Sequence, residues 1–167
     1  MTRKYIKEIK IKYFELYHVD KYTKMDYGST REVYISITNL KNSIFKMEYN
    51  PANPLHNMEE YRIYKNNYKN FNFLARVKGI SKDFRVLEME KLNTKSIEDI
   101  CNSSRYPIDT IFDLIKVQPN IKSKIDFDWG EVNVFIKKNK LDPEEIFYYK
   151  NWGLDKNGNL RLMDYSR

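Results

Sequence analysis

The sequence NWGLDKNGNLRLMDY, residues 151–165, carries the clearest structural signal in the chain. Its Asn157-Gly158 pair stands between two apolar stretches, which is a strong signal for a two-stranded hairpin. Asn151 opens this hairpin and Asp164 closes it, so both side chains are expected at the same end. An amide oxygen and a carboxylate suit Mg²⁺ held against a phosphate chain. The segment therefore predicts a metal site at Asn151 and Asp164, and a surface hairpin with polar ends is the alternative.

Strand and helix patterns alternate before this hairpin. The run 32–38, which alternates and is rich in β-branched and aromatic residues, predicts a strand, and 43–49 is expected to be a second strand after the polar turn at 39–42. Apolar residues recur at helical spacing over 55–73, which predicts a helix. Two more strands are expected at 74–80 and 84–90.

The second half of the sequence has a more helical character. Three helices are expected, at 96–103, 108–117 and 132–140. Strands come mainly before helices, which predicts an α+β fold rather than a wound parallel sheet. We expect two parts: residues 1–92 with the sheet and one helix, and residues 93–167 with the other helices and the terminal hairpin.

Composition limits the classes of protein to be considered. Hydrophobic residues make up 41% of the chain, which argues against intrinsic disorder. No apolar run approaches the roughly 20 residues that cross a bilayer. The first 14 residues lack the apolar segment of a signal peptide. We therefore expect a cytoplasmic protein without a membrane partner.

The net charge of +7 is compatible with a nucleic acid or another anion as ligand. The 30 basic residues are scattered among 23 acidic ones, and no dense basic block occurs, so a nucleic-acid partner is not the favoured interpretation. Cys101 is the single cysteine, and it has no neighbouring Cys or His with which to bind a metal. We expect it to be a packed thiol.

The hairpin and the elements before it resemble the protein-kinase-like superfamily. Asn151 and Asp164 match the catalytic-loop Asn and the metal-binding Asp of that family. Gly28 stands where the family has its glycine-rich phosphate loop, although only this one of the usual three glycines is present. Lys46, in the second predicted strand, matches the phosphate-binding lysine. Glu60, on the following helix, matches the glutamate that pairs with this lysine.

Each match also has an ordinary structural interpretation. Lys46 could extend from an edge strand, Glu60 could be a solvated helix residue, and Glu59 is the alternative partner for the lysine. The strand that ends at Met89 to Lys91 resembles the hinge whose backbone groups meet the adenine edge. The resemblance implies an antiparallel N-lobe sheet with one helix, a minimal helical C-lobe that ends in a β-hairpin, and ATP with Mg²⁺ as cofactors.

The sequence departs from the family pattern at two places. The catalytic Asp stands five positions before the catalytic-loop Asn, and Ile146 occupies that position here, so we assign no catalytic residue. After Asp164 the given sequence has no room for an activation segment and its substrate platform. Three nearby acidic residues are the alternative bases: Asp142, Glu144 and Glu145.

These features lead to three hypotheses. The first is a pseudokinase that resembles small bacteriophage-encoded kinase-like proteins. It would bind and modulate or inhibit a host protein in the host cytoplasm, with or without nucleotide. The second is a small atypical ATP-dependent phosphotransferase in which Lys46, Glu60, Asn151 and Asp164 hold Mg-ATP. The third is a basic nucleic-acid-binding module, whose affinity would fall steeply with salt.

Overall fold

The computed structural model describes most of the chain from Tyr22 onward. The described residues are 22–27, 30–36, 42–49, 55–95, 97–98, 108 and 125–165. They form two compact units. The first contains the described residues up to Lys65 together with Arg76–Lys91, and the second contains Asn66–Ala75 with those of Leu92–Tyr165. The units are discontinuous along the chain, and the division into 1–92 and 93–167 stays a prediction.

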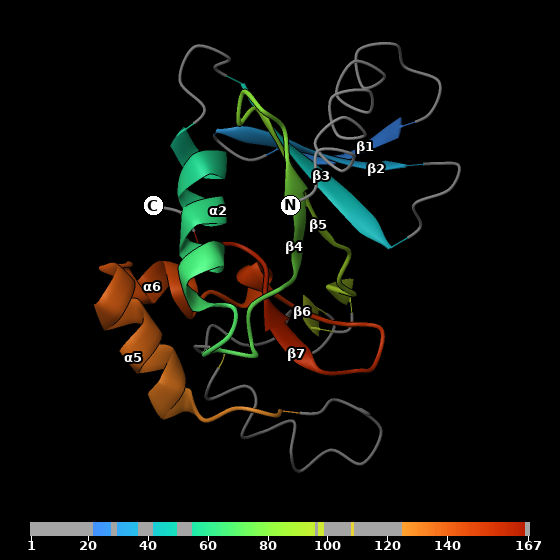
Figure 1. Ribbon diagram of the computed structural model, residues 1–167. Helices are drawn as coiled ribbons and strands as arrows, with labels where there is room; N and C mark the ends of the chain where they lie inside the picture. The colour runs from blue at the N-terminus through green and yellow to red at the C-terminus, as the bar shows by residue number, and fades with distance from the viewer. Residues whose placement is uncertain are drawn as a thin grey trace. The chain divides into compact units, whose positions relative to one another are not determined.

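The first unit is built on a five-stranded antiparallel sheet (Figure 1). The strands, in their order across the sheet, are β1 Tyr22–Tyr27, β2 Arg31–Ser36, β3 Ser43–Glu48, β5 Val86–Glu90 and β4 Val77–Ile80. Four of these strands lie in regions where the sequence predicts them, whereas its pattern does not predict β1. All six side chains of β3 are buried, as expected for a strand in the middle of a sheet.

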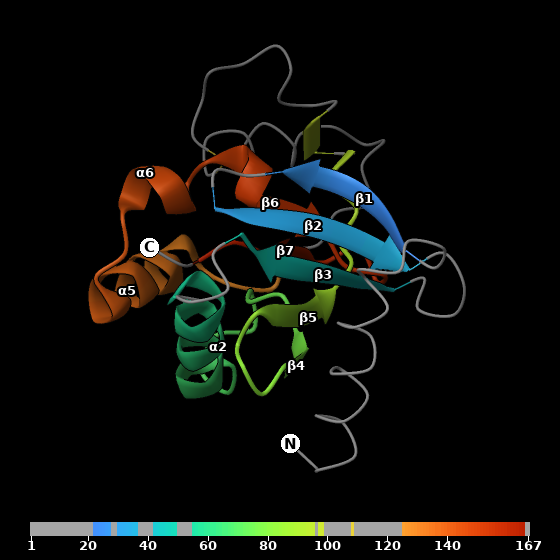
Figure 2. The ribbon, with the colours of Figure 1, turned by 90° about the horizontal axis from the view of Figure 1, so that it is seen from above.

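One helix, α2 (Leu55–Asn67), runs alongside this sheet (Figures 1 and 2). It ends six residues before the predicted end at residue 73, because Asn67 begins a turn. The carbonyl oxygen of Asn67 accepts hydrogen bonds from the N–H groups of Asn70 and Phe71. The side chain of Asn67 is engaged elsewhere in the chain, since its Nδ2 donates to Asn139 Oδ1 at 3.1 Å.

The buried face of α2 is largely polar. Asn57, Glu60 and Ile63 are buried at a spacing of three residues, and Asn67 follows four residues later. Met58 and Tyr68, two of the apolar residues that predict this helix, are instead exposed. The helical period is therefore correct, but the face that packs inward is the polar one.

The second unit contains the remaining described elements. They are α5 Trp129–Asn139, α6 Pro143–Ile146, the 3-10 helix η1 Tyr149–Asn151, and the strands β6 Trp152–Leu154 and β7 Leu160–Leu162. The helix α5 begins three residues before the predicted residue 132, because Asp128 and Glu131 form a capping box there. The strands β6 and β7 form the predicted hairpin, and Gly158 in its turn has φ of 80°.

Aromatic rings make up much of the core of the second unit. Phe73 lies edge-on to Phe135, with ring centroids 5.4 Å apart, and Phe127 stacks on Trp152 at 5.8 Å. Strand β7 also pairs with the segment before Arg76. Leu162 donates its N–H to the Phe73 carbonyl and accepts from the Ala75 N–H. These contacts explain why Asn66–Ala75 belongs to this unit.

The sheet, helices and hairpin confirm the predicted α+β class. The helices predicted at 96–103 and 108–117 lie largely outside the described residues, as do Gly28 and Cys101. In the described part of the chain, no helix is both long and apolar enough to span a bilayer.

Candidate functional site: a buried ion-pair cluster and the end of the hairpin

Lys46 and Glu60 form a buried ion pair in the first unit. Lys46 Nζ lies 2.8 Å from Glu60 Oε1 and 3.0 Å from Oε2. The Lys46 residue is 4% exposed and Glu60 is 0% exposed. Lys46 extends from β3, and Glu60 is on the second turn of α2. The partner predicted for this lysine is therefore present, and a role of the pair in holding a cofactor stays a prediction.

A second cation, which the sequence analysis missed, reaches the same carboxylate. Arg31, the first residue of β2, places Nη1 2.6 Å from Glu60 Oε2. The same nitrogen lies 3.3 Å from Asn57 Oδ1. The Arg31 side chain is 8% exposed, so water screens the contact with Glu60 very little. Glu60 is thus neutralised from two neighbouring strands at once.

Asn57 and Glu48 complete this polar cluster. The Asn57 N–H donates to Glu48 Oε1 at 2.6 Å, which fixes the beginning of α2 against the end of β3. Asn57 Nδ2 donates to the carbonyl oxygens of Lys46, at 3.1 Å, and Arg85, at 2.8 Å. Asn57 therefore holds the helix to the backbone of the strand that carries Lys46.

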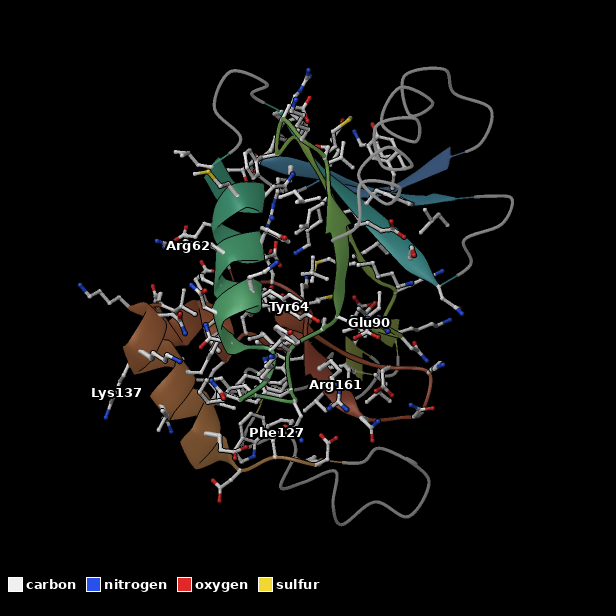
Figure 3. The ribbon with its side chains drawn as sticks, in the orientation of Figure 1. Arg62, Tyr64, Glu90, Phe127, Lys137 and Arg161 are labelled. Carbon is white, nitrogen blue, oxygen red and sulfur yellow. The ribbon has the colours of Figure 1, made fainter. Side chains whose placement is uncertain are left out.

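The predicted hinge segment is part of the sheet. Met89 is buried, and Lys91 is exposed. The N–H groups of Glu90 and Lys91 each donate to a backbone carbonyl at 2.9 Å, that of Arg76 and that of Asn42 respectively. Figure 3 labels Glu90 at the end of β5. These two N–H groups are therefore used within the protein. An adenine ring at this segment could donate its amino group to a backbone carbonyl oxygen, but neither of these N–H groups would be available to its ring nitrogens.

The hairpin of the second unit brings the two predicted metal ligands to one end. The N–H of Met163 donates to the Asn151 carbonyl at 2.8 Å, so Asp164 follows directly after the residue paired with Asn151. Asn151 Nδ2 donates to the Glu145 carbonyl at 2.7 Å. This bond orients the amide and leaves its oxygen as the atom suited to a metal.

The residues at this end of the hairpin supply one carboxylate and one amide oxygen. In the described part of the chain, no group of three or more His, Cys, Asp or Glu could hold a metal ion. Such a pair suits Mg²⁺ that arrives with a phosphate chain, because Mg²⁺ keeps several waters and uses few protein ligands. It does not suit a metal held by protein ligands alone. A role of Asn151 and Asp164 as ligands of a metal–nucleotide complex stays a prediction.

Ile146, which stands at the position where the family pattern has its catalytic Asp, is part of the core. Ile146 is the last residue of α6 and is 2% exposed. Its carbonyl accepts the hydrogen bond of Trp152 Nε1 at 2.7 Å, which anchors the start of β6. The three acidic alternatives, Asp142, Glu144 and Glu145, are all exposed. Asp142 also caps α6 by accepting from the Glu144 N–H at 2.9 Å.

A separate charged cluster supports the hairpin itself. Arg161, labelled on β7 in Figure 3, makes two bonds to Asp126, at 2.6 and 2.9 Å, and lies 3.4 Å from Asp155. Burial tends to raise the pKa of Asp155, but hydrogen bonds from Asn159 and Asn157 and the charge of Arg161 outweigh it. The net effect holds the pKa of Asp155 below its ordinary value. This carboxylate is engaged within the turn, so we assign it a structural role.

Comparison with known proteins adds little to this geometry. No family model matches the sequence, and no characterised protein matches it either. The crystal structure of the choline kinase LicA from Streptococcus pneumoniae aligns with 94% of this chain and 67% of that chain, with 15% identity and a TM-score of 0.46. Structural similarity at this TM-score and identity does not indicate a function, so the function has to be inferred from the residues of the site.

Proposed function

We propose that this chain is a kinase-like protein that binds Mg-ATP and acts by binding, not by transferring phosphate. The observation that carries the proposal is the buried pair of Lys46 and Glu60. It stands on the third strand of the sheet and on the helix that follows, which are the elements that carry the corresponding pair in protein kinases.

A buried ion pair is costly to form, because both charges lose their water. Apolar residues of similar size often stabilise a fold equally well or better. A lysine in the middle of a sheet, held by a fully buried glutamate, is therefore better explained by a ligand than by stability. Protein kinases use this pair to aim the lysine at ATP phosphates. In this chain Lys46 would supply that cation, while Asn151 and Asp164 would supply oxygens to Mg²⁺.

The residues near Asn151 argue against ordinary phosphoryl transfer. Loss of a positioned base lowers a reaction rate by about 10²–10⁴-fold. Ile146 is apolar and anchors Trp152 through its carbonyl, so the catalytic Asp could not be restored there without a charge in the core. The nearby Asp142 is used as a helix cap.

Binding to a protein partner is the second part of the proposal. Tyrosine is enriched where interfaces gain most of their energy. Three tyrosines are exposed among the described residues: Tyr49, Tyr68 and Tyr148. The resemblance to phage-encoded kinase-like proteins suggests a host protein in the cytoplasm as the partner, modulated or inhibited on binding.

The test is a titration of the purified chain with Mg-ATP by isothermal calorimetry. We expect saturable binding that weakens at least tenfold in Lys46→Met and in Asp164→Ala. Lys65→Met is the matched control for Lys46→Met, since Lys65 is an exposed lysine on α2, and it should bind like the wild type. Equal binding by all variants, or none by the wild type, would refute nucleotide binding.

A measurement of ATP turnover decides between the pseudokinase and the atypical phosphotransferase. The wild type is incubated with Mg-ATP, and ADP release is followed. We expect none above the background rate. Release that depends on Mg²⁺ and disappears in Asp164→Ala would instead establish the atypical phosphotransferase. With no acceptor added, the γ-phosphoryl group passes to water, and the same measurement on Glu144→Ala and Glu145→Ala, both exposed residues, would then show which acid orients the attacking water.

A further inference from the structure

Glu60 holds two cations, although one would neutralise it. Arg31 and Lys46 approach it from neighbouring strands, β2 and β3. In the register of these strands, Arg31 stands opposite Glu48, which is also buried. Glu48 accepts the Asn57 N–H at 2.6 Å, and His56 Nδ1 lies 3.5 Å from its other oxygen, so Glu48 has partners apart from the two cations.

The two cations are placed differently on the carboxylate. Arg31 Nη1 lies 2.6 Å from Oε2, whereas Lys46 Nζ has its shorter contact, 2.8 Å, with Oε1. Arg31 is also held by Asn57 Oδ1 at 3.3 Å. An arginine keeps a planar set of donors in fixed geometry, whereas a lysine ammonium sits on a flexible chain and turns easily. Arg31 is therefore suited to hold Glu60, and Lys46 is suited to move.

This difference matters for an anion that approaches Lys46. If Lys46 were the single partner of Glu60, its turning toward a phosphate would leave a buried carboxylate unpaired, at a large cost in free energy. With Arg31 in place, Glu60 stays neutralised when Lys46 turns away.

We propose that Arg31 is a positioning residue that holds Glu60 and thereby allows Lys46 to contact the phosphates of a bound nucleotide. The inference rests on the proposed function, because it needs a nucleotide at Lys46. It also goes beyond that function, since it gives the two cations separate roles. Arg31 holds the Glu60 carboxylate, and Lys46 contacts the phosphates of the nucleotide. Arg31 itself does not contact the ligand in this scheme.

The decisive experiment compares Mg-ATP with adenosine as ligands of wild type, Arg31→Met and Arg31→Lys. Adenosine lacks phosphates, so a change that acts through Lys46 should not alter its affinity. For Arg31→Met we expect Mg-ATP binding to weaken by between about 3-fold and 100-fold, the range of coupling between contacting residues. Adenosine affinity should stay within twofold of the wild type. Arg31→Lys should recover part of the ATP affinity.

Two controls separate positioning from general damage. Lys24→Met removes the exposed partner of Glu32 in the same sheet and should leave both affinities unchanged. In a background of Lys46→Met with Glu60→Gln, which leaves no unpaired carboxylate at position 60, adding Arg31→Met should cause no further loss of ATP affinity, because the residues on which it acts are absent. If Arg31→Met does not fold, Arg31→Lys carries the test, and weaker ATP binding with unchanged adenosine binding is the supporting result.

The outcomes distinguish this inference from the function on which it rests. If the wild type binds no Mg-ATP, the proposed function fails, and the inference is refuted with it. If the wild type binds and a folded Arg31→Met binds Mg-ATP equally well, the inference alone is overturned. A parallel loss of ATP and adenosine affinity would also overturn it, since that result indicates a distorted fold.

Discussion

The replacement Glu60→Gln gives the sharpest test of the buried cluster. The substitution would keep the shape of the side chain and remove its charge, so Arg31 and Lys46 would stay buried with one carboxylate too few. Breaking a buried ion pair by removing one partner costs about 3–5 kcal/mol. For a chain of this size, each kcal/mol lowers the melting temperature by roughly 2–4 °C. We therefore expect a fall of about 6–20 °C.

The neighbouring residue Glu59 provides the matched control. It pairs with Arg62 at 3.9 Å, and the Arg62 side chain is 67% exposed and points away from the sheet in Figure 3. The Glu59 side chain is 19% exposed, but its partner lies in water, and ion pairs with an exposed partner at this distance contribute at most about 1 kcal/mol. Glu59→Gln should therefore melt within about 4 °C of the wild type. The same chemical change thus has very different expected effects at adjacent positions.

The assay is thermal unfolding followed by far-ultraviolet circular dichroism, with urea unfolding as a second measurement. A third variant identifies the cause of the loss. Adding Lys46→Met to Glu60→Gln removes the excess buried charge, so the double variant should be more stable than Glu60→Gln alone. Equal melting temperatures for Glu59→Gln and Glu60→Gln, or a further loss in the double variant, would refute the reasoning.

Three further predictions concern the hairpin of the second unit. In Gly153→Ala the new Cβ would lie 2.6 Å from the Leu92 Cβ, so we expect a loss of about 1–3 kcal/mol in urea unfolding, and unchanged stability would contradict this packing. Trp152→Phe leaves the Ile146 carbonyl without its donor and should cost at least about 1–3 kcal/mol in the same assay, so a variant as stable as the wild type would count against the anchoring role. For Asp155, whose pKa is lowered by folding, the stabilising effect is present above its unfolded pKa of about 3.9 and is lost as pH falls through the folded value. The stability advantage of wild type over Asp155→Asn should therefore shrink below about pH 4, and a constant difference down to about pH 2 would contradict it.

Local patterns in the sequence predicted much of the fold. Residues 32–38 alternate and are rich in β-branched and aromatic residues, and most of them form β2. The Asn157-Gly158 pair predicted the hairpin, because only a few residue types adopt the backbone angles of a tight turn. Such signals are encoded within a few residues, so they can be recognised without the rest of the chain.

The helix α2 shows that a correct helical period does not decide which face of a helix is buried. Its apolar residues predicted a helix, yet its inward face carries Asn57 and Glu60. A polar residue is accepted in the interior only where partners for its hydrogen bonds are present, and the partners lie on other elements. The sequence predicted Glu60 as the partner of Lys46 only through resemblance to a family.

Reading along the chain is enough to obtain the α+β class, most of the order of strands and helices, and the residue types available for chemistry. Which of these residues meet depends on tertiary packing. Arg31 reaches Glu60 across 29 positions of sequence because β2 pairs with β3 and α2 packs beside them. Ile146 anchors Trp152 through a contact that no local pattern encodes. Burial then sets the strength of each contact, since a charge separated from water must be satisfied by whatever the fold places beside it.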